Sequence, residues 1–170
     1  MTEAILLESH PISGAYPERW FDARGECTFI LFEDNNYEKW LGVFGNSQIT
    51  RYSTVIPFSG TACVLVIARG QGYVVDVNMK ELRYKSSCGY IVSAIQVPSR
   101  DMIVACDFTD LYTFSSEKEL WRSEQIAMDG IEFVKATNSE VQGKAWIADH
   151  WQNFTLDVDT MSVVFRKVAE

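Results

Sequence analysis

Basic residues and long apolar runs are scarce in this 170-residue sequence. Lys and Arg number 15 against 23 Asp and Glu, which leaves a net charge of −8. An anionic protein repels phosphate backbones, so we expect no direct binding of nucleic acid. No segment approaches the ~20 apolar residues that span a bilayer, and residues 1–14 lack the basic start and long apolar core of a secretion signal. These absences predict a cytoplasmic protein that does not enter membranes.

Short motifs that bind metals or phosphates are also missing. Cys27, Cys63, Cys88 and Cys106 show no CxxC spacing, so we expect reduced, mostly buried thiols, with a metal site or a disulfide pair as alternatives. The glycines at 70 and 72 lack the third glycine and the following helix of a phosphate loop. The aspartates do not follow the spacing of a calcium loop. We therefore expect no cofactor and no metal.

A repeat runs through most of the chain. Residues 64–84 align without a gap with residues 102–122 and again with residues 145–165, and residues 27–52 form a looser fourth copy. Each copy has the pattern strand, tight turn, strand, tight turn, strand, because apolar runs alternate with polar or Gly-rich turns. A further strand candidate precedes each of the three closer copies, at residues 53–58, 91–97 and 131–136. The apolar residues at equivalent positions of the second strand are predicted to lie in the core, namely Leu65, Val66, Ile103, Val104, Trp146 and Ile147.

Four antiparallel strands per unit, repeated at a period of about 40 residues, are typical of propeller blades. We predict an all-β chain of about four propeller-like blades, an incomplete or half propeller, with a β-sandwich as the alternative. The chain forms one domain, residues 1–170, in which 27–170 hold the repeats and 1–26 form an irregular N-terminal segment. Within that segment, residues 4–8 are able to add a strand to the last blade.

One face of such an array is predicted to bind a partner. Equivalent turns of successive blades project from a common face, and here the turns between second and third strands combine acidic with aromatic residues. The predicted partner-binding residues are Glu33, Asp34, Tyr37, Asp107, Phe108, Asp110, Asp149, His150 and Trp151. Glu124 and Asp129, in a connection between blades, add to this face. Carboxylates steer a basic protein toward the surface and aromatic side chains anchor it.

Residues for catalysis are few. The chain has two histidines, His10 and His150, and a hydrolytic triad requires a histidine placed between a nucleophile and a carboxylate. We interpret His150, beside Asp149, as a solvated turn residue and expect no enzyme. A general base centred on His150 and Asp149 is the alternative.

The blade pattern is similar to WD40-type propeller repeats over residues 27–166, without their Gly-His opening or Trp-Asp ending. In size, acidity and β repeats the whole chain resembles immunity proteins of bacterial contact-dependent growth inhibition systems, in particular the propeller-like partner of an EndoU-type ribonuclease toxin. This resemblance implies a stoichiometric inhibitor that covers the active site of a basic nuclease domain. A subunit or scaffold of a larger assembly is the alternative, because an unclosed propeller leaves open sheet edges.

Overall fold

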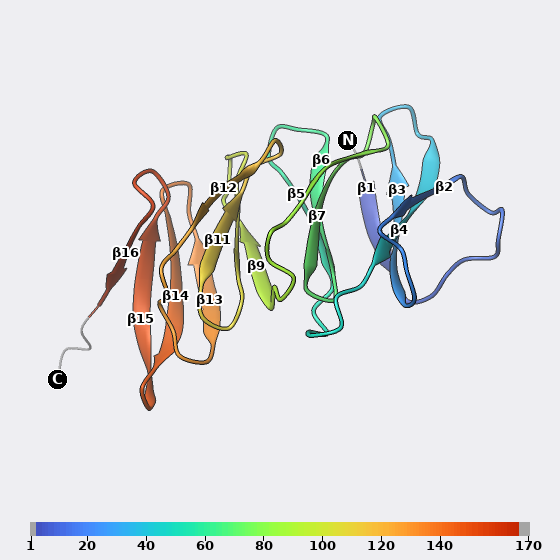
Figure 1. The fold of residues 1–170 in the computed structure, drawn as a ribbon. Helices are drawn as coiled ribbons and strands as arrows, with labels where there is room; N and C mark the ends of the chain where they lie inside the picture. The colour runs from blue at the N-terminus through green and yellow to red at the C-terminus, as the bar shows by residue number, and fades with distance from the viewer. Residues whose placement is uncertain (1–2, 167–170) are drawn as a thin grey trace.

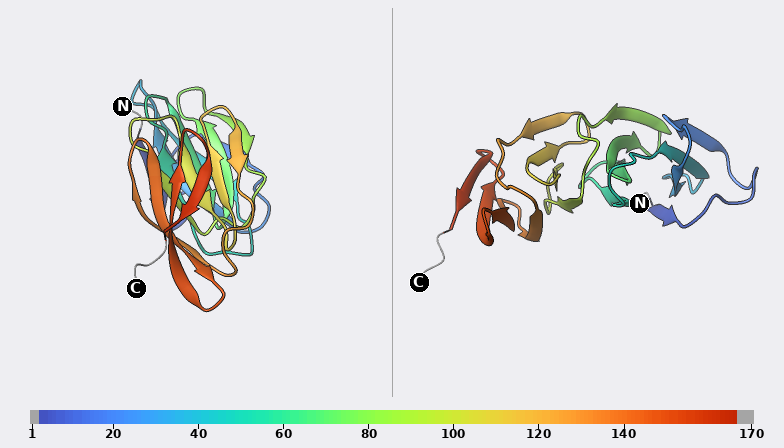
Figure 2. Two further views of the ribbon diagram at one scale, coloured as in Figure 1. Left: turned by 90° about the vertical axis from the view of Figure 1, so that its left-hand side faces the viewer. Right: turned by 60° about the horizontal axis from the view of Figure 1, so that its bottom comes forward.

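Four β-sheets stack side by side along an arc (Figures 1 and 2). The computed structural model describes residues 3–166, which form sixteen strands in four sheets of four strands each. No helix in this range is long and apolar enough to cross a membrane. The predicted all-β chain with four blade-like sheets is confirmed.

The first sheet has the order β1-β3-β4-β2 and consists of β1 (Glu3–Leu7), β2 (Glu18–Phe21), β3 (Cys27–Glu33) and β4 (Lys39–Gly45). The other three sheets are antiparallel meanders in chain order. The second consists of β5 (Thr54–Pro57), β6 (Cys63–Ala68), β7 (Gln71–Asp76) and β8 (Glu81–Lys85). The third consists of β9 (Ser93–Gln96), β10 (Ile103–Cys106), β11 (Leu111–Phe114) and β12 (Glu119–Arg122). The fourth consists of β13 (Ile131–Ala136), β14 (Glu140–Ile147), β15 (His150–Asp157) and β16 (Ser162–Phe165).

Apolar side chains between neighbouring sheets hold the arc together. A buried cluster fills each of the three interfaces, because every sheet has at least one apolar face that it cannot cover alone. Trp40 of the first sheet is fully buried, and its Nε1 donates a hydrogen bond of 3.1 Å to the Val77 carbonyl of the second. The strands β1, β5, β9 and β13 lie next to one another on the inner side of the arc (Figure 2).

The first sheet differs from the predicted fourth copy. Residues 48–52 form no strand, and the outer edge is occupied instead by β2, which pairs in parallel with β4. The segment 1–26 was expected to be irregular, yet it supplies both β1 and β2. The strand β1 pairs with β3 of the first sheet and not with the last blade. Residues 8–17 connect β1 at one edge of the sheet to β2 at the other. Such a crossover is needed because β2 runs parallel to its neighbour β4.

The strands β3 and β4 run in the opposite direction to their counterparts β6 and β7. The amide of Asn35 in the β3–β4 turn donates to Asn78 Oδ1 in the β7–β8 turn at 3.0 Å, whereas the Ser47 amide, just after β4, donates to the Ala68 carbonyl at the end of β6 at 3.1 Å. We call the edge of the arc with the β3–β4, β7–β8, β11–β12 and β15–β16 turns the upper edge. The edge with the β6–β7, β10–β11 and β14–β15 turns is the lower edge (Figure 1).

A carboxylate at the upper edge makes folding sensitive to acid. Asp76 is buried and accepts hydrogen bonds from the amides of Met79 (3.0 Å) and Asn78 (3.1 Å), and Arg83 pairs with it at 2.6 Å. Burial alone would raise the pKa of Asp76, but these donors outweigh it and hold the pKa below its usual value of 3.8. A lowered folded-state pKa contributes stability above the unfolded pKa, and this stability is lost as the pH falls through the folded pKa.

We expect Asp76→Asn to flatten the loss of stability below about pH 4, because an amide cannot titrate there. Urea denaturation of both proteins at a series of pH values measures this slope. Equal slopes for wild type and Asp76→Asn below pH 4 would show that Asp76 contributes nothing to acid unfolding.

Candidate functional site

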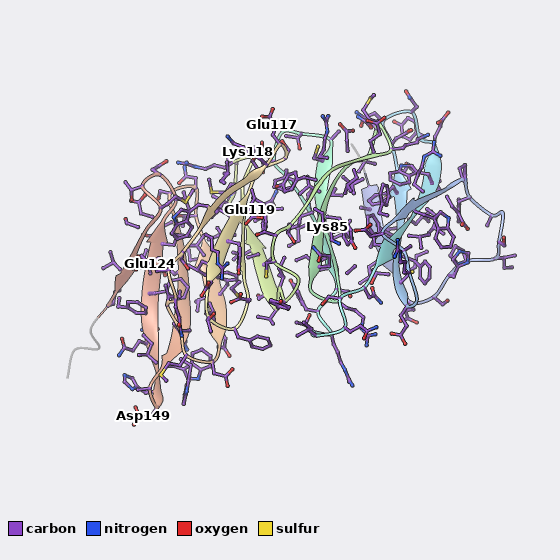
Figure 3. All side chains as sticks on the ribbon, in the orientation of Figure 1. Lys85, Glu117, Lys118, Glu119, Glu124 and Asp149 are labelled. Carbon is purple, nitrogen blue, oxygen red and sulfur yellow. The ribbon has the colours of Figure 1, made fainter. Side chains whose placement is uncertain are left out.

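The predicted partner-binding residues divide between the two edges of the arc. Glu33, Asp34 and Tyr37 lie at or beside the β3–β4 turn, on the upper edge. The other six lie at the lower edge, namely Asp107, Phe108, Asp110, Asp149, His150 and Trp151; Figure 3 labels Asp149 at its lowest point. The prediction of one common face is therefore wrong for the first three residues. The cause is the reversed direction of β3 and β4, which the sequence pattern of alternating strands and turns does not encode.

Asp34 holds its own turn together. Its side chain is 3% exposed, and Oδ1 accepts hydrogen bonds from the amides of Asn36 at 2.9 Å and Glu38 at 3.0 Å, while Lys80 lies 3.4 Å from Oδ2. Burial alone would raise the pKa of Asp34, but the amide donors and the Lys80 ammonium outweigh it and lower the pKa. This carboxylate is structural, whereas the adjacent Tyr37 is 83% exposed.

Asp107 and Asp110 are also structural and support the turn that carries Phe108. Asp107 Oδ1 accepts from the amides of Thr109 (2.8 Å) and Asp110 (2.7 Å), and its Oδ2 accepts from the Tyr112 hydroxyl at 2.8 Å. Burial, together with the bond to Asp107, raises the pKa of Tyr112 far above its usual range, so this hydroxyl remains a donor.

Asp110 completes this arrangement with an ion pair. Nε and Nη2 of Arg122 donate to its Oδ2 at 2.9 and 2.7 Å. Both carboxylates are buried, so neither offers a free negative charge to a partner. They fix a turn that leaves Phe108 42% exposed at its tip.

Next to this turn, at the lower end of the fourth sheet, several exposed apolar side chains lie close together. The Gly130 amide donates to the Phe108 carbonyl at 2.8 Å, and the Met128 amide donates to the Trp146 carbonyl at 2.8 Å. The rings of Trp146 and Trp151 meet edge to face with centroids 5.5 Å apart. We call this region the Trp151 surface, made of Phe108, Met128, Asp129, Trp146, Asp149 and Trp151.

The Trp151 ring packs closely against the backbone of Gly130, which has no side chain to hinder this contact. A Cβ added to Gly130 would lie 3.2 Å from the edge of the Trp151 ring, and the φ of +133° at this residue is one that L-residues rarely adopt. On the other side, the Ala148 amide donates to the sulfur of Met128 at 3.1 Å. The hairpin and the preceding connection therefore form one supported unit, in which Met128 is 61% and Trp151 39% exposed.

Two acidic residues, Asp129 and Asp149, belong to this surface, whereas Glu124, which was predicted on the same face, lies higher on the arc in Figure 3. Glu124 and Asp129 are exposed, and neither forms an ion pair within residues 3–166. The Asp149 side chain is 92% exposed and pairs only with His150 in this range, with Oδ1 2.9 Å from Nδ1. That hydrogen bond lowers the pKa of Asp149. The surface thus combines exposed carboxylates with exposed aromatic and thioether groups.

His150 is bonded at both ring nitrogens. Nδ1 faces Asp149 and Nε2 lies 2.9 Å from Nε2 of Gln152. No hydroxyl or thiol of the described residues forms a hydrogen bond to either nitrogen, so the nucleophile that a triad requires is not assembled beside it.

Two members of the Trp151 surface were not predicted. Trp146 and Ile147 were expected in the core by analogy with Leu65 and Ile103, which are fully buried, but both are only half-buried. The fourth sheet is the last one in residues 3–166, and within this range no further sheet packs on its outer face (Figure 1). Met128 lies in a connection without any sequence pattern. The repeat pattern alone did not separate Trp146 from its buried counterparts Leu65 and Ile103.

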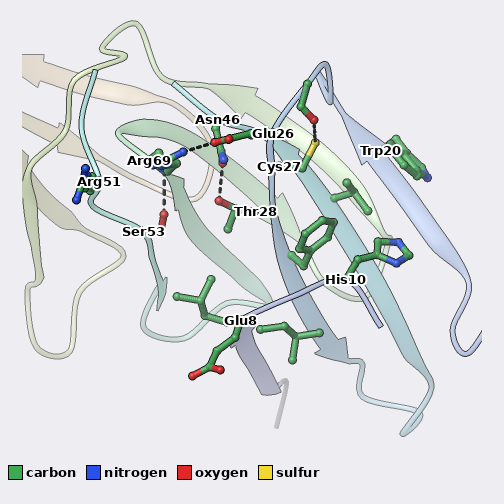
Figure 4. Close-up of a pocket in the computed structure, with 15 residues that line it drawn as sticks. Glu8, His10, Trp20, Glu26, Cys27, Thr28, Asn46, Arg51, Ser53 and Arg69 are labelled. Carbon is green, nitrogen blue, oxygen red and sulfur yellow. Dashed lines mark hydrogen bonds and ion pairs between the residues drawn. The ribbon is translucent and has the colours of Figure 1, made fainter. Parts of the chain in front are cut away.

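A hollow of about 990 Å³ lies at the lower end of the first sheet (Figure 4). Two pairs of its polar side chains bond to each other, Thr28 to Asn46 at 2.6 Å and Arg69 to Glu26. The half-buried thiol of Cys27 donates to the Gly25 carbonyl at 3.4 Å, and burial raises its pKa. The other three cysteines are buried, which confirms the prediction of mostly buried thiols, and no disulfide joins any of the four within residues 3–166.

The hollow and the Trp151 surface offer different chemistry. Within residues 3–166, no group of three or more His, Cys, Asp or Glu is arranged to hold a metal ion, in the hollow or elsewhere. The Trp151 surface instead presents exposed carboxylates beside large apolar groups. A scan against models of known protein families found no match for this chain, and a search of curated proteins found no relative.

Proposed function

We propose that this chain is an immunity protein, a stoichiometric inhibitor that binds a basic toxin, with a ribonuclease as the favoured target, and blocks its active site. The observation that carries this proposal is the contiguity of exposed Phe108, Met128 and Trp151 with the free carboxylates of Asp129 and Asp149. Energetic hot spots of protein interfaces are enriched in such large, rigid aromatic groups.

Charge favours a nuclease as the target. A ribonuclease binds a polyanion and therefore presents cations in its cleft. Exposed carboxylates at the Trp151 surface complement that field and accelerate association. A chain with a net charge of −8 also adds long-range attraction to a basic domain.

Shape supports blocking of a cleft. The strands β14 and β15 have eight residues each, more than any other strand of residues 3–166. Their hairpin extends below the other turns of the lower edge (Figure 1). It carries Trp151 and Asp149 at its tip, so the anchoring ring and the free carboxylate reach a concave surface together.

Co-expression tests the function. A basic nuclease domain encoded beside this chain is produced in bacteria with and without it, and we expect survival only in its presence. The double variant Asp149→Lys with Trp151→Ala should abolish protection, whereas Tyr37→Ala with Glu117→Lys, on the upper edge, should retain it. Death of cells that contain the soluble wild-type chain would contradict the proposal.

Charge reversal at the surface should slow encounter with the toxin. We expect Asp129→Lys with Asp149→Lys to reduce the association rate constant by about tenfold at low ionic strength, with a smaller reduction at high salt. Stopped-flow kinetics or surface plasmon resonance at several salt concentrations measures this. Glu117→Lys with Glu81→Lys is the matched control, since it makes the same change in net charge away from the surface. An equal reduction in the control would assign the effect to net charge alone.

A further inference from the structure

Each sheet has one edge strand on the outer side of the arc, namely β2, β8, β12 and β16 (Figure 2). These four strands differ in whether charged side chains hinder pairing with another chain. An outer strand leaves one row of backbone N–H and C=O groups unpaired, and charged side chains normally prevent another chain from pairing there. Three of the four carry such charges: Glu18 and Arg19 in β2, Glu81, Arg83 and Lys85 in β8, and Glu119 and Arg122 in β12. The fourth, β16, has the sequence Ser-Val-Val-Phe and carries none.

The apolar side chains of β16 are exposed. Val164 is 61% and Phe165 36% exposed. Within residues 3–166, β16 pairs only with β15, so its other edge has no partner strand. An uncharged, exposed edge on a chain that protects its other outer edges indicates a strand that is covered in solution.

We propose that a second copy of this chain covers β16, through antiparallel pairing of β16 with itself across a two-fold axis. The Arg166 amide donates to the Asn153 carbonyl at 2.9 Å, which makes Arg166, Val164 and Ser162 the residues whose backbone groups point toward β15. The N–H and C=O groups of Val163 and Phe165 therefore point to the free edge.

The register follows from these free groups. Val163 of each copy forms a hydrogen-bonded pair with Phe165 of the partner subunit. The two-fold axis of the dimer then passes through the pair of Val164 residues. The two Val164 side chains then form a non-hydrogen-bonded pair, the closest kind of cross-strand contact in an antiparallel sheet. In the same register Arg166 lies opposite Ser162 of the second copy, so no like charges face each other along the strand.

The dimer leaves the Trp151 surface free. Antiparallel pairing reverses the second copy, so the two lower edges point in opposite directions along one continuous eight-stranded sheet. Each copy retains its own surface for a partner. The inference does not depend on the proposed function, and either one can fail without the other.

Sedimentation equilibrium across a range of concentrations tests the pairing. We expect the wild-type chain to reach twice its mass of 19.3 kDa at physiological ionic strength, which screens the repulsion between two acidic chains. Val164→Lys should give a monomer, because it places two ammonium groups against each other at the axis. Val134→Lys is the matched control and should remain a dimer, since Val134 is also 61% exposed and lies on the opposite edge strand of the same sheet, β13.

A monomeric wild-type chain at every concentration would overturn the proposal. A dimer that survives Val164→Lys, or one that Val134→Lys dissociates, would overturn it as well. Crosslinking provides a test that does not depend on a disruptive variant. Two Cα atoms at a non-hydrogen-bonded antiparallel pair lie about 4.5 Å apart, within reach of a disulfide. We expect Val164→Cys to form an intermolecular disulfide under mild oxidation on non-reducing gels, and its absence there, or equal crosslinking of Val134→Cys, would contradict the register.

Discussion

Replacing Trp151 by alanine is expected to weaken binding of the cognate toxin by about 30- to 1,000-fold, which corresponds to about 2–4 kcal/mol. The Trp151 ring rests on Gly130 and meets Trp146 edge to face, so it is held in place before binding and loses little rotamer freedom when a partner covers it. Isothermal titration calorimetry of the purified pair measures this loss.

Tyr37→Ala is the matched control for Trp151→Ala. Tyr37 is an aromatic residue that is 83% exposed on the opposite edge of the arc, and its removal should change the affinity by less than about twofold. The proposed docking surface would be wrong if Tyr37→Ala lost more affinity than Trp151→Ala.

The largest effect on stability is expected from Trp40→Ala, which should lower the free energy of unfolding by about 3–5 kcal/mol. Trp40 is fully buried between the first two sheets, and its ring stacks on Phe32 with centroids 4.3 Å apart. The substitution leaves a cavity there and also removes the hydrogen bond to the Val77 carbonyl, so this buried acceptor loses its partner.

Urea denaturation followed by circular dichroism measures the effect of Trp40→Ala. Trp20→Ala serves as the control, because Trp20 belongs to the same sheet but is 60% exposed. We expect the control to cost less than about 1 kcal/mol. A loss below 1 kcal/mol for Trp40→Ala would contradict the account of how the first two sheets pack.

The three meander sheets were predictable because each strand in them pairs with the strand that follows it in the sequence. The turns at residues 69–70, 107–110 and 148–149 interrupt apolar runs at equivalent positions. A hairpin needs only such a turn between two strands that follow each other along the chain. The repeat then placed Leu65, Val66, Ile103 and Val104 in the core, where all four are fully buried.

The first sheet was not predictable because its pairing is not local. The strand β2 joins β4 in parallel only after the crossover at residues 8–17, and no periodicity links β2 to its partner. The reversed direction of β3 has no sequence signal either. As a consequence, Asp34 occupies the edge opposite to Asp149, although both follow a second strand in the repeat.

Sequence also cannot distinguish a free carboxylate from a bonded one. Asp107 and Asp149 both lie in turns between second and third strands. The first is buried and accepts four hydrogen bonds from groups of its own hairpin, one of them from the Tyr112 hydroxyl. The second is 92% exposed and contacts only His150 among the described ion pairs. Tertiary contacts decide which of the two is available to a partner.

Hydrogen–deuterium exchange of the chain alone and in complex with the toxin domain tests most directly where the inhibitor docks. We predict that binding slows amide exchange at residues 107–110, 126–130 and 146–152, which form the lower edge of the third and fourth sheets. Exchange at residues 34–38 and 77–80, on the upper edge, should remain unchanged. Protection of the upper-edge turns, with no change at the β14–β15 hairpin, would contradict the account.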